Sequence, residues 1–541
     1  MDRIMAPMDS GVVILAYDHA LWILVRDNAL SLESSFDAVM PYGCRHSSSR
    51  NAAARLADGC MVRSSLRGLS VLTLSFAVNA SQAAELPELG DRSSGLVSPT
   101  TERELAQIAL KQIRSSVEVV SDPILKYYVK VNVHRLAEFS GITEPALTTV
   151  LIDNPQINAF AVPGGIVGIN LGLFLYAHDE SEYSAVVAHE LAHLGQRHYA
   201  RSVEQQRAMS PWMLAGLLAS LAIAAGGGGE AGMAALFGTQ AYAQDKALRF
   251  SRSREQEADR IGLNTLERAG LDPDAMGRMF ERMQTAFRFV DKPPEFLLTH
   301  PLTESRITDA RNQAERFEDR TVEPSLDYQF MRARARVHFA ESPRHAVVEA
   351  QSLHGGGDAD TYALAVALSE ADRHEEAVKT AHRLYKAHPG SLLMAASFAE
   401  ILIAAERLDE AVALLSDKLR INPDNEPLTY LKAEALDAAD RHAEAAELLW
   451  RHTRVNTNDV DVWHLLAETA GLAGDTIGVH RARAEYFALF GAYRQAIQHI
   501  DYARRLLDGD DRPLRARLDQ RVLDLRTEYE AALEQSGPGP G

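Results

Sequence analysis

The sequence predicts a mainly α-helical protein, in which an α+β domain with a small sheet is followed by an all-α array of repeated helices. Three observations lead to this fold class: short extended runs between residues 148 and 169, an apolar helical run at 184–195, and a 34-residue spacing in the second half. A chain of 541 residues is expected to hold two or three domains. Its formal charge of −18 argues against nucleic acid and anionic membrane surfaces as partners.

The first 84 residues differ from the rest of the chain. Residues 1–60 show no clear hydrophobic period and hold both cysteines, Cys44 and Cys60. From Met61, a positive start, a short apolar run and a small-residue end are typical of a secretory signal peptide. We therefore expect 61–84 to be a signal peptide and 1–60 a non-native extension, so that the mature chain enters an oxidising compartment without cysteine. The alternative is a genuine N-terminal extension with a buried apolar helix.

The first folded domain is expected to span residues 95–320. Helical periodicity runs from residue 101 to about 120 and resumes after Pro123. Extended runs follow at 148–152 and 159–162, and a third at 166–169 comes after the turn-forming Pro163-Gly164-Gly165. These three runs predict a small sheet directly ahead of the apolar helix.

The apolar helical run carries His189, Glu190 and His193. Residues four apart share one helix face, so the two imidazoles can close on one metal ion. Glu190 follows the first histidine and can take a proton from a water at that ion, which is the His-Glu-x-x-His pattern of zinc peptidases. The alternative, two solvated histidines, fits poorly because residues such as Val187 and Leu191 make the helix apolar nearly all round, and such a helix is buried.

A second helical run supplies carboxylates at Glu255, Glu257 and Asp259. Glu255 and Asp259 share a helix face, so we assign Glu255 as the third metal ligand. Asp259 can accept the outer N–H of a ligating histidine. Glu257 points roughly the opposite way and is expected to be a solvated charge. The alternative for Glu255 is a surface network with Arg254 and Arg260.

These motifs resemble one family of gluzincin metallopeptidases, which includes the CAAX prenyl endopeptidases, HtpX-type membrane proteases and soluble periplasmic relatives. The residues that carry the resemblance are His189-Glu-x-x-His193, Glu255-x-x-Ala258-Asp259, His300-Pro301 and the approach at 158–165. The resemblance implies a zincin-like fold and one Zn²⁺ per chain, with His189, His193 and Glu255 as ligands and Glu190 as catalytic base. The resemblance also favours a role in substrate binding for the extended run at 158–162, the candidate edge of the sheet.

A free sheet edge beside the metal would let a substrate backbone add as a further strand. The candidate edge is 158–162, with substrate-binding residues Asn158, Ala159, Phe160 and Ala161. On the residues alone, an internal hairpin without a substrate role is an equal alternative.

His300 and Arg306 are two further candidates for a catalytic role. His300 could donate to the oxyanion of the tetrahedral intermediate, or it could occupy the open metal position and hold the enzyme latent. Arg306 is a second candidate donor, and a structural salt bridge is its alternative. His198, five residues after His193, is expected to be structural.

Between the two metal-binding helices lies an apolar, glycine-containing stretch at 211–240. Its continuous apolar run of about 14 residues is short of the ~20 needed to span a bilayer. A buried helix, a mobile lid and a membrane-surface contact are the three alternatives. We therefore expect no transmembrane span, which separates this chain from the integral-membrane members of the family it resembles.

From about residue 325 the chain repeats. Two sets of residues recur 34 positions apart: Arg373, Arg407 and Arg441, and Ala377, Ala411 and Ala445. This period resembles the tetratricopeptide repeat, two antiparallel helices per unit with small residues where they cross. We expect the array at 325–530 and a disordered tail at 531–541.

The sequence therefore predicts a secreted, periplasmic zinc metalloendopeptidase whose repeats recruit a protein or peptide substrate. The resemblance alone implies a role in outer-membrane protein quality control and docking on the outer-membrane assembly machinery. The alternative is a periplasmic chaperone or adaptor whose zinc is structural or permanently capped. A prenyl-protein protease is disfavoured because membrane spans are missing.

Overall fold

The structure is a computed structural model that describes residues 12–17, 20–25, 98–142, 147–205, 252–290, 293–318, 322–352, 357–507 and 511–536. It divides into two compact units, residues 1–84 and 85–541. In the first unit, β1 (Val12–Tyr17) and β2 (Ala20–Val25) pair as an antiparallel hairpin. The expected signal peptide at 61–84 and the stretch 211–240 lie outside the described residues.

The second unit begins with α1 (Pro99–Ser116) and α2 (Pro123–Ala137). Each starts at a proline behind a side chain that caps the first turn, Ser98 for α1 and Asp122 for α2. The prediction that α1 reaches about residue 120 is wrong, because the helix ends at Ser116 and Val119 forms an isolated bridge with the sheet. Valines at 117, 119 and 120 favour extended backbone, and the sheet edge supplies a partner for it.

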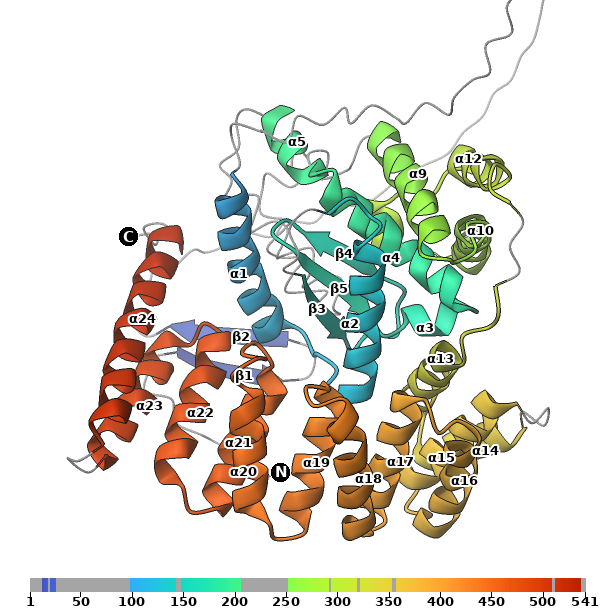
Figure 1. Ribbon diagram of the computed structural model, residues 1–541. Coiled ribbons are helices and arrows are strands. Elements are labelled where there is room, and N and C mark those ends of the chain that lie inside the picture. The colour runs from blue at the N-terminus through green and yellow to red at the C-terminus, as the bar shows by residue number, and fades with distance from the viewer. Residues whose placement is uncertain are drawn as a thin grey trace, which may run out of the picture. The chain divides into compact units, whose positions relative to one another are not determined.

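The three predicted extended runs form one sheet. Its strands are β3 (Thr148–Ile152), β4 (Ala159–Val162) and β5 (Ile166–Asn170), in the order β3-β5-β4. The central strand β5 is parallel to β3 and antiparallel to β4, which places β4 at an edge (Figure 1). The tight β4–β5 turn uses Gly164 and Gly165 at φ of 86° and 99°, where a side chain would be strained.

The helix α4 (Glu180–Gly195) follows the sheet and packs against β4 and α2. Asp179 caps it by accepting from the N–H of Glu182, and the Glu182 carboxylate accepts from the N–H of His178. Every residue from 181 to 193 is buried, as the apolar sequence predicts. The helix α9 (Arg252–Arg268) crosses α4 closely at Gly262, where an added Cβ would lie 3.4 Å from the backbone nitrogen of His189.

Short helices complete this part of the chain. They are α3 (Leu173–Tyr176), α5 (His198–Gln205), α10 (Ala275–Phe287), α11 (Glu295–Thr299) and α12 (Glu304–Ala314). Of these, α10 packs on α4 and α12 packs on both α9 and α10.

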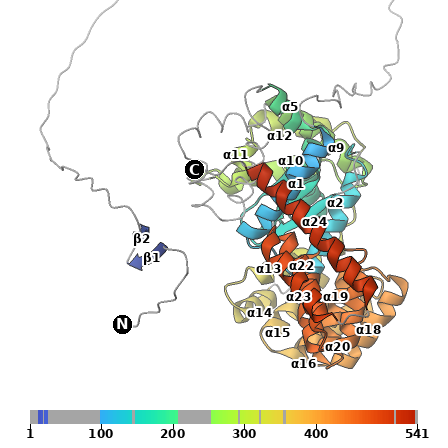
Figure 2. The same cartoon turned by 90° about the vertical axis from the view of Figure 1, so that its left-hand side faces the viewer.

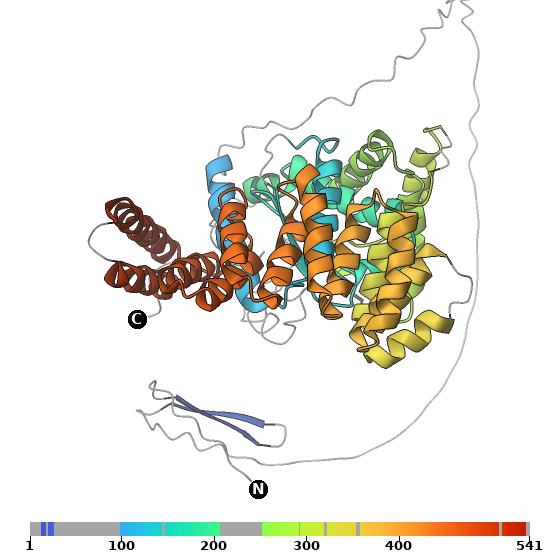
Figure 3. The same cartoon turned by 60° about the horizontal axis from the view of Figure 1, so that its bottom comes forward.

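The remaining helices form the array, in which consecutive helices pack against each other (Figure 3). They are α13 (Leu326–His338), α14 (Pro343–Ser352), α15 (Asp358–Glu370), α16 (His374–Ala387), α17 (Leu392–Ala404), α18 (Leu408–Ile421), α19 (Glu426–Ala438), α20 (His442–His452), α21 (Val460–Leu472), α22 (Thr476–Leu489), α23 (Tyr493–Leu506) and α24 (Arg512–Ser536).

The 34-residue period has a local structural cause. Asp372, Glu406 and Asp440 follow alternate helices, α15, α17 and α19, in the left-handed conformation at φ near 57°, and Gly474 takes the next place in this register, after α21, at φ 78°. The arginine after each acidic residue forms an ion pair with a glutamate three positions on, as at Arg373–Glu376. The recurring alanines 377, 411 and 445 are fully buried where helices cross.

The tail prediction needs a correction. The helix α24 packs on α23 and continues to Ser536, so residues 531–536 are helical rather than disordered (Figure 2). The segment Glu530-Ala-Ala-Leu-Glu consists of strong helix formers. Among the described residues, none of the helices combines the length and apolar character needed to cross a membrane.

A matched pair of glycine substitutions tests the packing of α1 on the β4–β5 turn. Gly164 and Gly474 share a positive φ, but a Cβ at Gly164 would lie 2.3 Å from the carbonyl oxygen of Glu102, whereas a Cβ at Gly474 meets nothing within 4 Å. We expect Gly474→Ala to lower the free energy of unfolding by about 1–2 kcal/mol, and Gly164→Ala by about 2 kcal/mol more, because the clash adds overpacking. Urea unfolding measures both, and equal losses would contradict the close approach.

Candidate metal centre

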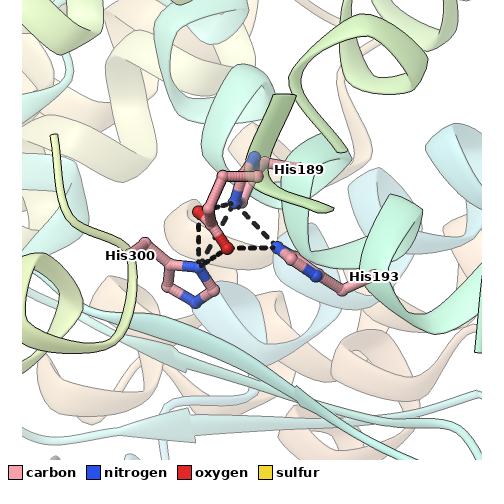
Figure 4. Close-up of side chains that lie close together, drawn as sticks. His189, His193 and His300 are labelled. Atoms are coloured by element: carbon pink, nitrogen blue, oxygen red, sulfur yellow. Dashed lines mark hydrogen bonds and ion pairs between the residues drawn. The ribbon is translucent and has the colours of Figure 1, made fainter. Parts of the chain in front are cut away.

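The helix α4 brings two imidazoles together on one face. The Nε2 atoms of His189 and His193 lie 3.0 Å apart, and both side chains are buried (Figure 4). This contact follows from the four-residue spacing, which stacks the side chains over successive turns. Because the surrounding helix surface is apolar, these nitrogens need partners inside the protein.

Glu255 reaches the same point from α9. Its carboxylate oxygens lie 3.5 Å from the Nε2 atoms of His189 and of His193. His300, which follows α11, completes the cluster with its Nδ1 3.1 Å from Glu255 Oε2 and 3.4 Å from His189 Nε2 (Figure 4). The structure therefore brings together the three residues predicted as ligands and adds His300.

The donor set fits a divalent metal ion. One ligand atom from each of His189, His193, Glu255 and His300 can be chosen so that all four lie within 4.8 Å of one another. Three imidazoles and one carboxylate match the ligand types and number of a tetrahedral zinc site. Metal–ligand bonds of about 2.0–2.1 Å separate tetrahedral ligands by roughly 3.3 Å, close to the distances of 3.0–3.5 Å between these atoms in the structure.

The outer nitrogen of His189 meets Asp259, as predicted for that carboxylate. His189 Nδ1 lies 2.9 Å from Asp259 Oδ1. Arg306 holds Asp259 in turn, donating from Nε and Nη2 at 2.8 and 2.7 Å. Such a carboxylate fixes the orientation and tautomer of a ligating imidazole.

Arg306 has two further partners within this network. Its Nη1 donates to the carbonyl of Pro301 and lies 3.0 Å from Glu255 Oε2. The guanidinium is buried and is thereby committed to two carboxylates and a carbonyl. This geometry favours the structural salt bridge over the oxyanion donor that the sequence left open for Arg306.

His193 has a partner that the sequence analysis missed. His198 Nδ1 lies 2.7 Å from His193 Nδ1, and His198 Nε2 lies 3.2 Å from Glu257 Oε2. The expectation that Glu257 is only a solvated charge is therefore wrong, although it keeps about a third of its side-chain surface exposed. Burial lowers the pKa of His198 to about 4. The signal in the sequence was the five-residue spacing from His193 to His198. This spacing indicates a contact only if the helix is known to end between the two residues.

Glu190 lies between the ligand cluster and the sheet edge. Its Oε1 is 3.4 Å from His300 Nε2, and its carboxylate accepts a hydrogen bond from the backbone N–H of Ala161 in β4. Burial raises the pKa of Glu190, against the opposing influence of His300 and His189. A carboxyl with a raised pKa beside a metal site is suited to proton transfer near neutral pH.

Glu255 behaves in the opposite way. Burial works to raise its pKa, but the charge of His300 and hydrogen bonds from His189 and His300 hold that pKa well below the ordinary value. The two carboxyls of this site therefore differ: the surroundings favour the ionised form of Glu255 and the protonated form of Glu190.

The four candidate substrate-binding residues lie at or beside the edge strand β4. Asn158 and Ala159 are buried, whereas Phe160 and Ala161 are half-buried. Phe160 lies over Gly168 of the central strand, where an added Cβ would come within 2.1 Å of its ring. The Asn158 carbonyl accepts from the N–H of Asn170, so β4 pairs inward with β5 while the Ala161 N–H faces Glu190.

Comparisons with known proteins agree with this geometry. Residues 123–314 match the profile of peptidase family M48, and residues 402–469 match that of the tetratricopeptide repeat. The chain is 35% identical over 317 residues to the β-barrel assembly-enhancing protease of Escherichia coli K12, which covers 58% of this chain and 65% of that protein. It is 39% identical to a putative protein of that name from Vibrio cholerae, covering 49% of this chain and 54% of the relative.

A more distant similarity reaches a mitochondrial enzyme. The metalloendopeptidase OMA1 of Schizosaccharomyces pombe is 32% identical, covering 39% of this chain and 60% of the relative. The chain thus spans about two-thirds or less of the length of these relatives. Together the matches confirm the resemblance drawn from the motifs: the chain carries a metallopeptidase domain of family M48, followed by tetratricopeptide repeats.

Proposed function

We propose that this protein is a zinc-dependent metalloendopeptidase of the periplasm, acting in quality control and assembly of outer-membrane proteins. The observation that carries the proposal is the buried cluster of His189, His193, Glu255 and His300 beside Glu190 and the edge strand β4. It combines metal ligands, a proton acceptor and a place for an extended peptide within one site.

The chain supplies most of the chemistry through Glu190. A zinc ion held by His189, His193 and Glu255 would supply Lewis-acid activation of water and of the substrate carbonyl. The Glu190 carboxylate takes a proton from the attacking water as the water oxygen bonds to the peptide carbon. The same proton then passes from Glu190 to the leaving amine as the C–N bond breaks.

An extended peptide added along β4 would lie beside Glu190. Strand addition uses backbone hydrogen bonds, so it tolerates many side chains, and this suits a protease that meets unfolded substrates. The Ala161 N–H already donates to Glu190, which fixes the strand against the proton acceptor.

His300 occupies the position that a substrate or water would need. Its Nδ1 faces Glu255 and His189, and its Nε2 faces Glu190, so the ring fills the fourth corner of the ligand set. We propose that this arrangement is the latent form, and that displacement of His300 opens the site. The alternative role for His300 is donation to the oxyanion of the tetrahedral intermediate.

The cellular setting rests on the relatives and the chain's N-terminal sequence. Two relatives are named β-barrel assembly-enhancing proteases, and the predicted signal peptide at 61–84 would export the chain to the periplasm. The repeats would recruit the substrate or dock the enzyme on the outer-membrane assembly machinery, because stacked helix pairs form extended surfaces for peptides and proteins.

The position of His300 also supports a second candidate function. If the imidazole remains in the ligand set permanently, the protein is a chaperone or adaptor with a capped metal. The two functions differ in whether removing the His300 ring exposes a working peptidase.

Replacing Glu190 by glutamine tests the proton transfer. Glu190→Gln keeps the shape but removes the basic carboxylate, so we expect zinc content to be unchanged and kcat/KM for an unfolded outer-membrane protein to fall by about 10²–10⁴-fold. Glu138→Gln, at an exposed position after α2, is the matched control and should keep full activity. An active Glu190→Gln enzyme would contradict the assigned role.

The ligand role of Glu255 is tested by metal binding. Glu255→Gln removes the negative charge and one strong donor, so zinc affinity should fall by more than about 100-fold, because changes even to outer partners of ligands cost 10–100-fold. Competition with a chromophoric chelator measures the affinity. Stoichiometric zinc bound with wild-type affinity by Glu255→Gln would remove the basis of the proposed site.

The latent form is tested by removing the imidazole of His300. We expect His300→Ala to retain zinc through the other three ligands and to raise basal cleavage of an unfolded substrate severalfold, with chelator abolishing the gain. Zinc retained with activity lost would instead assign His300 to the oxyanion. Zinc retained with no cleavage by either wild type or variant favours the adaptor.

A further inference from the structure

The end of α4 is folded back so that one histidine meets another. After Gly195 the chain passes through Arg197 at a φ of 48°, an unfavourable conformation for a residue with a side chain, and α5 begins at His198. The Arg197 guanidinium holds this turn by donating two hydrogen bonds, of 3.0 and 3.2 Å, to the carboxylate of Glu102 on α1. The turn places His198, which is fully buried, against the outer side of His193.

Three residues then form a line that leads away from the ligand cluster. His193 Nδ1 and His198 Nδ1 are 2.7 Å apart, and His198 Nε2 is 3.2 Å from Glu257 Oε2. Arg201, one turn after His198, lies 3.3 Å from the same Glu257 oxygen. Glu257 comes from α9, the helix that also supplies Glu255 and Asp259.

Only one arrangement of protons satisfies this line when His193 binds a metal through Nε2. The ligating nitrogen must carry a lone pair, so the proton of neutral His193 is on Nδ1 and is donated to His198 Nδ1. His198 must then accept at Nδ1 and carry its own proton on Nε2. That proton points to the Glu257 carboxylate, which can only accept.

We infer that His198 is a positioning residue for the metal ligand His193, and that Glu257 and Arg201 fix the His198 ring for this task. This inference rests on the proposed function, because it assumes that His193 is a ligand. His198 accepts the outer N–H of His193, as Asp259 accepts the outer N–H of His189. The acceptor for His193 is a neutral imidazole instead of a carboxylate. Both interactions depend on α9, because this helix carries Asp259 itself and also Glu257, which contacts His198.

The test compares zinc affinities of His198 variants with that of the wild-type full chain, using a chromophoric chelator as competitor. His198→Phe fills the same space but cannot accept from His193, so affinity should fall by about 10–100-fold. His198→Asn keeps an acceptor near the Nδ1 position and should recover most of that loss. A role confined to packing predicts the reverse order, because asparagine leaves a larger gap than phenylalanine.

A second variant keeps the inference testable if His198→Phe does not fold. Glu257 is partly exposed on α9, so Glu257→Leu should leave the fold intact while weakening zinc binding, and Glu257→Gln, which can still accept from His198, should weaken it less. Unchanged affinity in both Glu257→Leu and His198→Phe would overturn the inference. Failure of the wild type itself to bind zinc would instead overturn the proposed function.

Discussion

The close crossing of α4 and α9 is the constraint on which the rest of the site depends. Gly262 lies at this crossing, where an added Cβ would touch the backbone nitrogen of His189 at 3.4 Å and would overlap Met276 Cε at 2.7 Å. At this separation α4 supplies His189 and His193 and α9 supplies Glu255 and Asp259, without long side chains that would have to be ordered. Because both helices are buried here, each polar atom must find its partner on the opposing helix or on the short helices packed against the pair.

This constraint explains why the surroundings of the site are so fully paired. Asp259 faces His189 and is held by Arg306, while Glu257 faces His198 and is held by Arg201. Two separate lines of polar contacts therefore support His189 and His193, the two histidines that we propose as metal ligands. Glu190 stands apart from both, between the ligand cluster and the outer edge of β4, which is the position that its proposed proton exchange with substrate requires.

The sequence predicts those parts of this site that depend on residues close together in the chain. The pair His189–His193 and the shared face of Glu255 and Asp259 follow from helical spacing alone. The strands on either side of the glycine turn follow from their extended apolar runs. The contact of His198 with His193 does not, because it depends on a left-handed residue at 197 that is unusual for arginine. For Arg306 the sequence left a structural salt bridge open but did not identify its partner Asp259, which lies 47 residues away in the chain.

The same reasoning applies to the attachment of the repeats. Asp122 accepts from the N–H groups of Ile124 and Leu125 through Oδ1, which starts α2, and pairs through Oδ2 with the buried Arg334 of α13. Arg334 also binds Glu400 of α17 at 2.6 Å. Since α2 packs directly on α4, one carboxylate both caps the helix behind the candidate metal ligands and fastens the first repeats to it. Local rules identify Asp122 as a cap, but its second role depends on a partner more than two hundred residues away and is visible only in the folded chain.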